Sequence, residues 1–428
     1  MAHFKTRAIH TGNQADETLS RGVAIYPTAA YEFRDCEHAA ELFKLNSDGH
    51  IYTRLSNPTT SRYEDKVNAL YGGVGAVATS SGMAAILVAI TTIAKAGDNI
   101  VTSPYLYGGT FNVFKHTLKD LGINVKFAKS DSIEDISNEI DHHTKAVFVE
   151  SMSNPGCRVP DLSGLANLAH IYKIPLIVDN TFGACGYLCN PLQWGADIIV
   201  DSATKWINGH GNAMGGVIVD GGKFDWASGP FEDLTQPSEA YHGLNFYEKF
   251  GNKAFIIKCR AGGLRDLGCN PSPFDTFLMM LGLETLALRV DHIASITEVL
   301  NTYFKTQPWV REVQSAQTVS PESAINFAKY FDSKSMVLSI VLSGNEETTS
   351  KLVESLKLSK HMTMIGDSVT SVTHPASTTH KQLSEEDKVA TGILPTLLRI
   401  SPGLEHVTDI IEDYEQAINN IKPTEAVK

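Results

Sequence analysis

From about residue 72 onward, the chain alternates between short apolar runs and longer stretches with apolar residues at helical spacing. The runs are rich in Val, Ile and Leu and cover residues 74–79, 99–102, 124–128, 146–150, 175–178, 198–200 and 217–219. Helical spacing covers residues 83–95, 110–121, 133–140 and 162–172. Runs without polar alternation are typical of strands covered on both faces, and strands that alternate with helices predict parallel pairing. We therefore expect an α/β domain over residues 57–270, with a mainly parallel central sheet flanked by helices.

The two ends of the chain do not follow this alternation. Residues 1–56 predict an extended N-terminal arm, with some helix near residues 37–45. Residues 271–428 predict a smaller C-terminal α+β domain, because their mixed elements allow few parallel crossovers. Its expected elements are a long helix at 274–289 that runs on toward 303, strands at 336–342 and 396–400, and helices at 349–356 and 407–421.

Length, charge and cysteine content narrow the class of protein. A chain of 428 residues is too long to fold around a single hydrophobic core of ordinary size, so two or more packed units are expected. The formal net charge of −12 argues against a nucleic-acid partner, because phosphate binding needs a basic surface. The N-terminus has no apolar signal-peptide core, and the most apolar stretch, 82–96, is too short and too polar to cross a bilayer. Six scattered cysteines do not suggest a disulfide framework. We expect a cytoplasmic protein without a membrane partner.

A lysine follows one of the predicted strands in the segment Asp201-Ser202-Ala203-Thr204-Lys205. Ligands of α/β sheets bind outside the carboxyl ends of the strands. A desolvated lysine there can lose its proton and attack an aldehyde, and the two hydroxyls beside it can bind a phosphate. The alternative is a lysine on a surface loop, which is where most lysines lie. The segment alone does not decide between these two interpretations.

Other strand ends carry residues of matching chemistry. Asp179 closes an apolar strand, and a protonated pyridine nitrogen would be a suitable partner for it, although a turn aspartate is the common alternative. The small residues 80–83 separate a strand from a helix whose N-terminus can attract an anion. They form neither a Walker A motif nor a dinucleotide fingerprint. Tyr107 follows the strand at 99–102 and could stack on an aromatic cofactor or simply pack in its loop.

Together these residues make a family recognisable. The chain resembles, over essentially its whole length, the Cys/Met-metabolism enzymes that depend on pyridoxal phosphate (PLP). The resemblance implies the aspartate-aminotransferase-like PLP fold, fold type I. Its markers are Tyr52-Thr53-Arg54, Asn57-Pro58-Thr59, Ser80-Ser81-Gly82-Met83-Ala84, Tyr107-Gly108-Gly109-Thr110, Val178-Asp179-Asn180-Thr181, Ser202-Ala203-Thr204-Lys205-Trp206, His374-Pro375-Ala376-Ser377 and Arg399-Ile400-Ser401.

The resemblance also assigns roles around the cofactor. It implies that Lys205 holds PLP covalently as an aldimine and carries protons, that Asp179 keeps the pyridine nitrogen protonated, and that Tyr107 stacks on the ring. Asn154 corresponds to the residue near the ring hydroxyl. The phosphate would be bound by the backbone of two residues and the hydroxyls of two others, namely Gly82, Met83, Ser202 and Thr204. No metal is implied, and no spacing of His, Cys or carboxylates supports one.

Two further roles concern the substrate and the assembly. Arg399 matches the arginine that binds the substrate α-carboxylate. Tyr52 and Arg54 match residues that reach the active site of a neighbouring subunit, where Arg54 would bind the phosphate in two-pronged fashion and Tyr52 would also approach the substrate. The resemblance therefore implies a homo-oligomer, with a dimer as the minimal active unit and a tetramer as the expected assembly.

Within the family, one segment favours a particular branch. Between Gly216 and Arg265 lies a long connection that includes Gln236-Pro237-Ser238-Glu239-Ala240-Tyr241-His242-Gly243. It is similar to the O-acetylhomoserine sulfhydrylases, particularly the fungal forms. The implied reaction converts O-acetylhomoserine and sulfide to homocysteine and acetate in methionine and cysteine biosynthesis, with O-acetylserine as a further candidate substrate. One departure is Met364, which stands where related enzymes often carry a small polar residue near the substrate carboxylate; Ser368 is a candidate substitute for it.

Several alternatives stay open at this point. Cystathionine γ-synthase and methionine γ-lyase belong to the same family, and only the length of the connection after Gly216 argues against them. A catalytically silent regulatory paralogue is disfavoured by the joint presence of Lys205, Asp179, Tyr107 and Arg399. A nicotinamide-dependent dehydrogenase would need a glycine fingerprint that the sequence does not contain.

Overall fold

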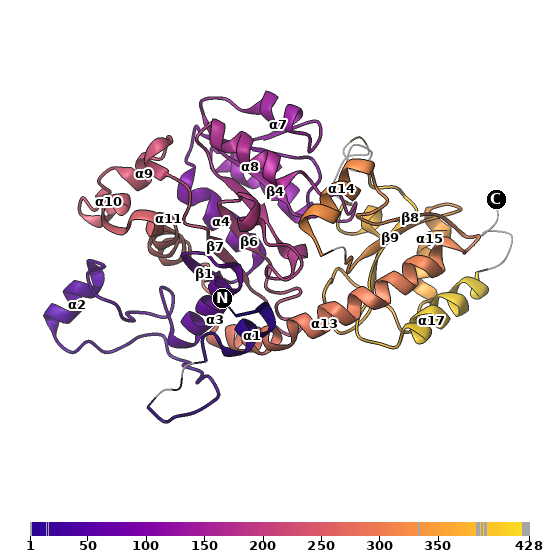
Figure 1. Cartoon of the computed structure of the whole chain (residues 1–428), viewed down its shortest axis with the longest axis horizontal. Coiled ribbons are helices and arrows are strands. Elements are labelled where there is room, and N and C mark those ends of the chain that lie inside the picture. The colour runs from indigo at the N-terminus through magenta and orange to yellow at the C-terminus, as the bar shows by residue number, and fades with distance from the viewer. Residues whose placement is uncertain are drawn as a thin grey trace.

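The chain builds two β-sheets with helices around them (Figure 1). The computed structural model describes residues 2–421 except residues 14, 16, 333, 382–385, 387 and 389–391. The larger sheet has seven strands in the order β1-β7-β6-β5-β4-β2-β3. Its strands are β1 (Gly75–Thr79), β2 (Asn99–Thr102), β3 (Asn124–Phe127), β4 (Thr144–Glu150), β5 (Leu176–Asp179), β6 (Ile198–Asp201) and β7 (Gly216–Asp220). Neighbouring strands pair in parallel except at β7, which is antiparallel to both β1 and β6.

Except for the edge strand β3, the strands of the larger sheet are mostly buried on both faces. Every residue of β2, β6 and β7 is buried. Because successive side chains of a strand point to opposite faces, unbroken burial requires cover on both sides of the sheet. In β2, β6 and β7 polar and charged side chains therefore stand only at the strand ends. Glu150, Asp179 and Asp201 are the last residues of β4, β5 and β6.

The helices begin where the sequence supplies capping groups. The hydroxyl of Ser81 accepts a hydrogen bond from the N–H of Ala84 at the start of one helix, and the amide oxygen of Asn57 accepts from Thr59 at the start of another. The helices of the first 270 residues are α1 (Phe4–His10), α2 (Cys36–Phe43), α3 (Pro58–Tyr71), α4 (Gly82–Ile93), α5 (Gly108–Asn112), α6 (Leu118–Asp120), α7 (Ile133–Glu139), α8 (Leu162–Ile171), α9 (Glu232–Thr235), α10 (Phe246–Phe250), α11 (Ala254–Lys258) and α12 (Arg265–Leu267).

The second sheet has its own hydrophobic cluster. Its five strands run in the order β10-β11-β12-β9-β8, and they pack with the C-terminal half of the long helix and with the last helix through buried residues such as Leu300, Leu398 and Tyr414. The elements are α13 (Pro273–Lys305), β8 (Val310–Gln314), α14 (Pro321–Tyr330), β9 (Leu338–Leu342), α15 (Glu346–Ser355), β10 (Lys360–His361), β11 (Ser371–Thr373), β12 (Leu397–Ser401) and α17 (Val407–Asn420).

Helix α13 packs directly on the segment that follows Lys205. A Cβ atom at Gly282 would lie 2.2 Å from the carbonyl oxygen of Ile207, so the two backbones are in contact there. Further along the helix, the buried guanidinium of Arg289 donates from Nη2 to the carbonyl oxygens of Trp206, at 3.0 Å, and of Gly282, at 2.7 Å. The helix that supports the second sheet is thus also the support of the Lys205 segment.

The predicted fold class is confirmed, with differences in detail. The structure adds elements that the hydrophobic pattern did not reveal, above all α1, α3, α14 and β8. Polar residues outnumber apolar ones in helix α3, and they mask the apolar face that this helix buries. The helix expected at 110–121 is interrupted by a π-helical turn at Val113–Thr117. The domain bounds at 56 and 270 remain predictions. No helix among the described residues is long and apolar enough to span a membrane.

The contact between α13 and the Lys205 segment can be tested with Gly282→Ala. We expect the free energy of unfolding to fall by about 1–3 kcal/mol, because the added methyl meets backbone carbonyls that cannot move aside freely. Chemical denaturation of the purified variant measures this loss. The matched control is Gly262→Ala, since a Cβ there meets no atom within 4 Å. Equal stability of both variants would show that the contact tolerates extra volume.

Candidate functional site

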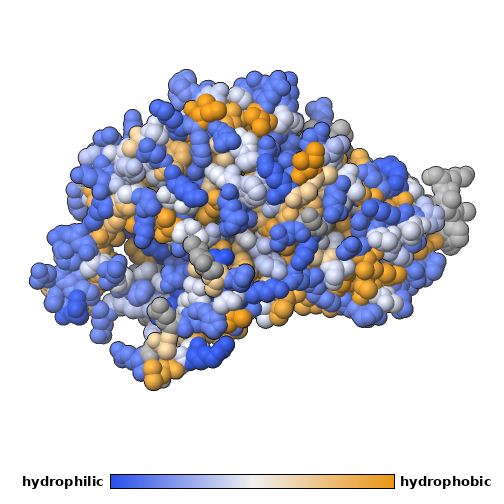
Figure 2. Space-filling view, in the orientation of Figure 1, coloured by the Kyte–Doolittle hydropathy of each residue, from blue (hydrophilic) through white to orange (hydrophobic). Residues whose placement is uncertain are grey.

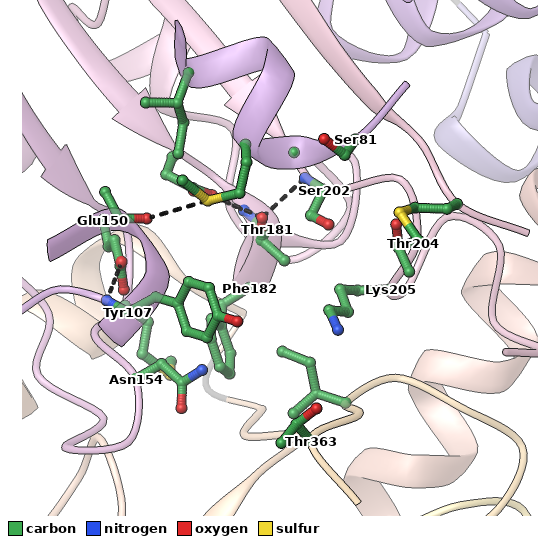
Figure 3. Close-up of a pocket in the computed structure, with 18 of the residues that line it drawn as sticks. Ser81, Tyr107, Glu150, Asn154, Thr181, Phe182, Ser202, Thr204, Lys205 and Thr363 are labelled. Carbon is green, nitrogen blue, oxygen red and sulfur yellow. Dashed lines mark hydrogen bonds between the residues drawn. The ribbon is translucent and has the colours of Figure 1, made fainter. Parts of the chain in front are cut away.

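A cavity of about 240 Å³ opens at the carboxyl ends of β4, β5 and β6, beside the N-terminus of α4 (Figure 3). This is where parallel α/β sheets place their ligands. The second sheet contributes to its wall through β12. Its lining residues are Ser81, Gly82, Met83, Ile86, Tyr107, Thr110, Glu150, Met152, Asn154, Asp179, Thr181, Phe182, Ser202, Thr204, Lys205, Met214, Thr363, Ile365 and Arg399.

Most of the residues predicted for the site meet in this cavity. It brings together Gly82, Met83, Tyr107, Asn154, Asp179, Ser202, Thr204, Lys205 and Arg399. Tyr52 and Arg54 do not line it; they line another hollow with Pro273 and Phe274. There the guanidinium of Arg54 lies 5.3 Å from the centre of the Tyr52 ring and donates to the carbonyl oxygen of Arg265. Within a single chain, these two residues are therefore separate from the site.

The amine of Lys205 is held in a desolvated position. Burial lowers the pKa of Lys205 to about 8, and the positive charge of Arg399 contributes to this lowering. Its Nζ atom lies 3.4 Å from the Sδ atom of Met364, a weak acceptor. Such a lysine has a neutral, nucleophilic form close to neutral pH.

Asp179 presents one carboxylate oxygen to the cavity. Its Oδ1 atom accepts hydrogen bonds from the backbone N–H of Thr181 at 3.0 Å and from the Thr181 hydroxyl at 2.6 Å. No donor among the described residues is hydrogen-bonded to Oδ2. Burial raises the pKa of Asp179, while the bonds from Thr181 oppose that rise. A cationic N–H donor from a ligand would satisfy Oδ2 and favour the ionised form.

The start of α4 forms a concave surface of suitable chemistry for an anion. A Cβ atom at Gly82 would lie 2.7 Å from the Cβ of Ser202, so only glycine leaves room there. The first N–H groups of a helix lack partners within the helix and point at such a space. The Thr204 hydroxyl lines the same cavity but is already bonded to the backbone of Gly215, donating at 3.2 Å and accepting at 3.1 Å.

Tyr107 stands across the cavity from Lys205, as Figure 3 shows. Its backbone N–H donates to Oε1 of Glu150 at 2.5 Å. Its ring covers Gly109, where a Cβ atom would lie 2.5 Å from the ring carbon Cε1. The side chain is 38% exposed, and the ring is free to contact a planar ligand in the cavity.

Arg399 is a buried cation without a carboxylate partner among the described residues. Its Nη1 atom donates to Oδ1 of Asn154 at 3.1 Å, and its Nη2 atom donates to the carbonyl of Met364 at 3.0 Å and to the hydroxyl of Thr373 at 2.8 Å. Within the described part of the chain, Nε has no partner. Burial lowers the pKa of Arg399 to about 10. A buried guanidinium in this state favours an anionic ligand.

The structure clarifies the departure at Met364. Its carbonyl is bound by Arg399 and its sulfur contacts Lys205, so it sits between the two cations. Thr363, rather than Ser368, supplies a hydroxyl to the lining. The Ser368 hydroxyl donates to Oδ1 of Asp367 instead.

Some lining residues were not singled out from the sequence. Thr181 is the last residue of the Asp179 marker and Phe182 follows it, so their position along the chain was a usable signal. Met152, Met214 and Thr363 come from loops without a recognisable pattern, and only the folded chain brings them to the cavity.

These features fit PLP, whose phosphate, pyridine nitrogen and aldehyde need three different partners. The concave surface at Gly82 suits the phosphate, the free Oδ2 of Asp179 suits a protonated ring nitrogen, and the desolvated Lys205 amine suits the aldehyde.

The lowered pKa of Lys205 leads to a measurable expectation. In protein freed of PLP, acylation of Lys205 should reach half its maximal rate near pH 8, because burial disfavours the ammonium form. Mass spectrometry of the Lys205 peptide at a series of pH values measures that rate, with peptides of exposed lysines as internal controls. A half-maximum near 10.5, the ordinary value, would contradict a desolvated amine.

Comparisons with known proteins agree with this geometry. The family model for Cys/Met metabolism PLP-dependent enzymes matches residues 5–419. Homocysteine synthase of Schizosaccharomyces pombe is 46% identical over 422 residues, which cover 97% of this chain and 98% of that protein. O-acetyl-L-homoserine sulfhydrylase 1 of Thermus thermophilus is 45% identical over 418 residues, which cover 97% and 99%.

A solved structure extends the comparison to the fold. It is a Campylobacter jejuni protein assigned provisionally as an O-acetylhomoserine (thiol)-lyase, and it carries N′-pyridoxyl-lysine-5′-monophosphate at its position 205. The TM-score is 0.94 at 34% identity, and the match covers 98% of this chain and 100% of that one. The predicted family and the predicted cofactor are thereby confirmed, and the chain belongs to the Cys/Met metabolism PLP-dependent enzymes.

Proposed function

We propose that this enzyme replaces the acetate of O-acetylhomoserine with sulfide, so that O-acetylhomoserine and HS⁻ give homocysteine and acetate. The observation that carries the proposal is the meeting of Lys205, Asp179 and Arg399 in one cavity. The names of the relatives supply the substrate class. O-acetylserine is a second candidate donor, because it differs from O-acetylhomoserine by a single methylene.

PLP, when bound, supplies an electron sink that stabilises negative charge on the carbons of an amino acid next to its nitrogen. The chain's own residues bind and orient. Asp179 would hold the proton on the ring nitrogen, and the backbone of Gly82 and Met83 with the Ser202 hydroxyl would bind the phosphate. Tyr107 would cover the ring, and Asn154 would lie near its hydroxyl group.

Arg399 and Lys205 would act on the substrate itself. Arg399 binds the α-carboxylate and thereby fixes the face on which the α-proton lies. Lys205 is the only amine among the described lining residues, so it is the residue placed to take that proton and return one later. Its lowered pKa keeps a neutral fraction available for this task.

The lining of the cavity favours sulfide over an amino-acid acceptor. Cysteine, the acceptor of a cystathionine γ-synthase, brings a second carboxylate that needs a cation. Arg399 and Lys205 are the only cations among the described lining residues, and both already have roles. The remaining wall is largely apolar, with Ile86, Met152 and Phe182. A small nucleophile needs no such partner.

We propose further that the active unit is a dimer in which Tyr52 and Arg54 complete the site of the partner subunit, and that two dimers form a tetramer. Helix α13 supports this idea. Phe274, Leu281 and Leu288 are 54%, 48% and 66% exposed, and their spacing of seven residues places them along one side of the helix. Figure 2 shows hydrophobic residues along the lower edge, where Figure 1 places α13. Exposed apolar stripes of this kind suit an interface.

We place the reaction in the cytoplasm as part of this proposal. All six cysteines are free, and four of them are buried. Unpaired cysteines suit a reducing compartment.

The proposed reaction is tested with the purified holoenzyme and O-acetylhomoserine. We expect homocysteine and acetate in equal amounts when sulfide is the acceptor, and none from Lys205→Ala because the proton carrier is missing. Chromatography of the products measures both. Efficient use of cysteine as acceptor, or breakdown of methionine, with no homocysteine from sulfide, would overturn the proposal in favour of the synthases or lyases.

The shared active site is tested by mixing two inactive variants, Arg54→Ala and Lys205→Ala. If each site takes Arg54 from one subunit and Lys205 from the other, refolding an equal mixture should restore about a quarter of the parental activity, since half of the dimers are mixed and each holds one intact site. Each variant refolded alone is the control. No recovery in mixtures that form mixed dimers would place both residues in the same subunit's site.

A further inference from the structure

The wall of the cavity contains a second carboxyl group that the proposed reaction does not use. Glu150 ends β4, Asp179 ends β5, and the two residues are register partners in this parallel pair. Neighbouring strands of a sheet lie about 4.8 Å apart. Both side chains line the same cavity, so the two carboxyl groups are near neighbours on one face of the sheet.

Glu150 has no cation to offset a charge. Lys205 and Arg399 also line the cavity, but within the described part of the chain neither donates a hydrogen bond to the Glu150 carboxyl group. Glu150 also forms no ion pair with any described residue. Its neighbours are the backbone N–H groups of Tyr107, at 2.5 Å from Oε1, and of Asn154. The side chain belongs to a residue that is only 6% exposed.

Two adjacent carboxylates, one buried and one partly buried, cannot both be ionised at moderate cost when neither has a cationic partner. Burial raises the pKa of Glu150 well above its ordinary value, and the charge of Asp179 raises it further. Asp179 receives two hydrogen bonds from Thr181 that favour its ionised form, and Glu150 receives two from backbone N–H groups that oppose the rise in its pKa, so these bonds do not decide between the two carboxyls. The ligand's protonated ring nitrogen would add a third, charged donor to Asp179 alone. The proton of the pair therefore belongs on Glu150.

We propose that Glu150 is a positioning residue that stays protonated in the working enzyme, where it holds the backbone of Tyr107 and leaves Asp179 as the charged carboxylate of the pair. As a neutral acid, Glu150 still accepts the Tyr107 N–H through its carbonyl oxygen. It fixes the residue that covers the cofactor without competing with Asp179 for the ring nitrogen. This inference rests on the cofactor roles proposed above for Tyr107 and Asp179.

The test compares Glu150→Gln, which copies a neutral acid, with Glu150→Ala, which removes the acceptor. Infrared difference spectra of holoenzyme at pH 7 should show a protonated-carboxyl band in the parent that Glu150→Gln lacks. Glu312→Gln, the same change at an exposed carboxylate of β8, is the control and should keep the band. PLP affinity, measured by titrating apoprotein, should change less than about twofold in Glu150→Gln and fall about tenfold in Glu150→Ala, the cost of leaving a buried N–H without its acceptor.

Two results would overturn the inference. One is the absence of the carboxyl band at pH 7, which would make Glu150 ionised. The other is a loss of PLP affinity in Glu150→Gln as large as in Glu150→Ala. If Glu150→Ala does not fold, a loss of tenfold or more in Glu150→Gln serves as the second criterion. Both readouts are independent of product formation, so a failure of the proposed sulfur chemistry would leave this test intact.

Discussion

Burial of the central strands of the larger sheet on both faces is the constraint from which the site arises. Strands such as β6 and β7 expose no residue, so a charged side chain can be placed only where a strand ends. Parallel pairing then brings the carboxyl ends of β4, β5 and β6 to one edge. Glu150 and Asp179 end β4 and β5 at this edge, and the Lys205 segment follows β6 there, so all three meet in one cavity.

Lys205, Asp179 and Arg399 are reactive because they are shielded from water and have no ion-pair partner among the described residues to compensate for it. Lys205, Asp179 and Arg399 form no ion pair with one another or with other described residues, although all three line a small cavity. The cost of burying such charges is met by a tightly built sheet and helix framework. In the proposed roles, a ligand would supply the missing partners: a ring nitrogen for Asp179, an aldehyde for Lys205 and a carboxylate for Arg399. The shifted pKa values of Lys205 and Arg399 express the same desolvation.

The two sheets are coupled through α13. Its N-terminal half touches the Lys205 segment at Gly282, and its C-terminal half packs in the cluster of the second sheet. Arg399, from β12 of that second sheet, reaches the cavity and bonds with Asn154, which follows β4 of the first. The distance between the Arg399 guanidinium and the Lys205 amine therefore depends on the packing of one helix against the Lys205 segment and the second sheet.

The sequence by itself determined the elements of the larger sheet, because buried strands and amphipathic helices leave different periodicities. It also marked the strand-end residues Lys205, Asp179 and Tyr107, since each follows an apolar run and belongs to a motif of the family. It did not reveal α3, whose polar residues mask its buried face, nor Met214 and Thr363, which lie in loops without a pattern. Only the tertiary structure decided which of the marked residues share a site and what state they are in.

Folding brings Arg399 and Lys205 together although nearly two hundred residues of chain separate them. It leaves Tyr52 and Arg54 outside the cavity of their own chain. Folding also placed Glu150 beside Asp179 and gave Met364 a contact with the Lys205 amine. Such contacts depend on strand register and on burial, which are properties of the packed chain and leave no local trace in the sequence.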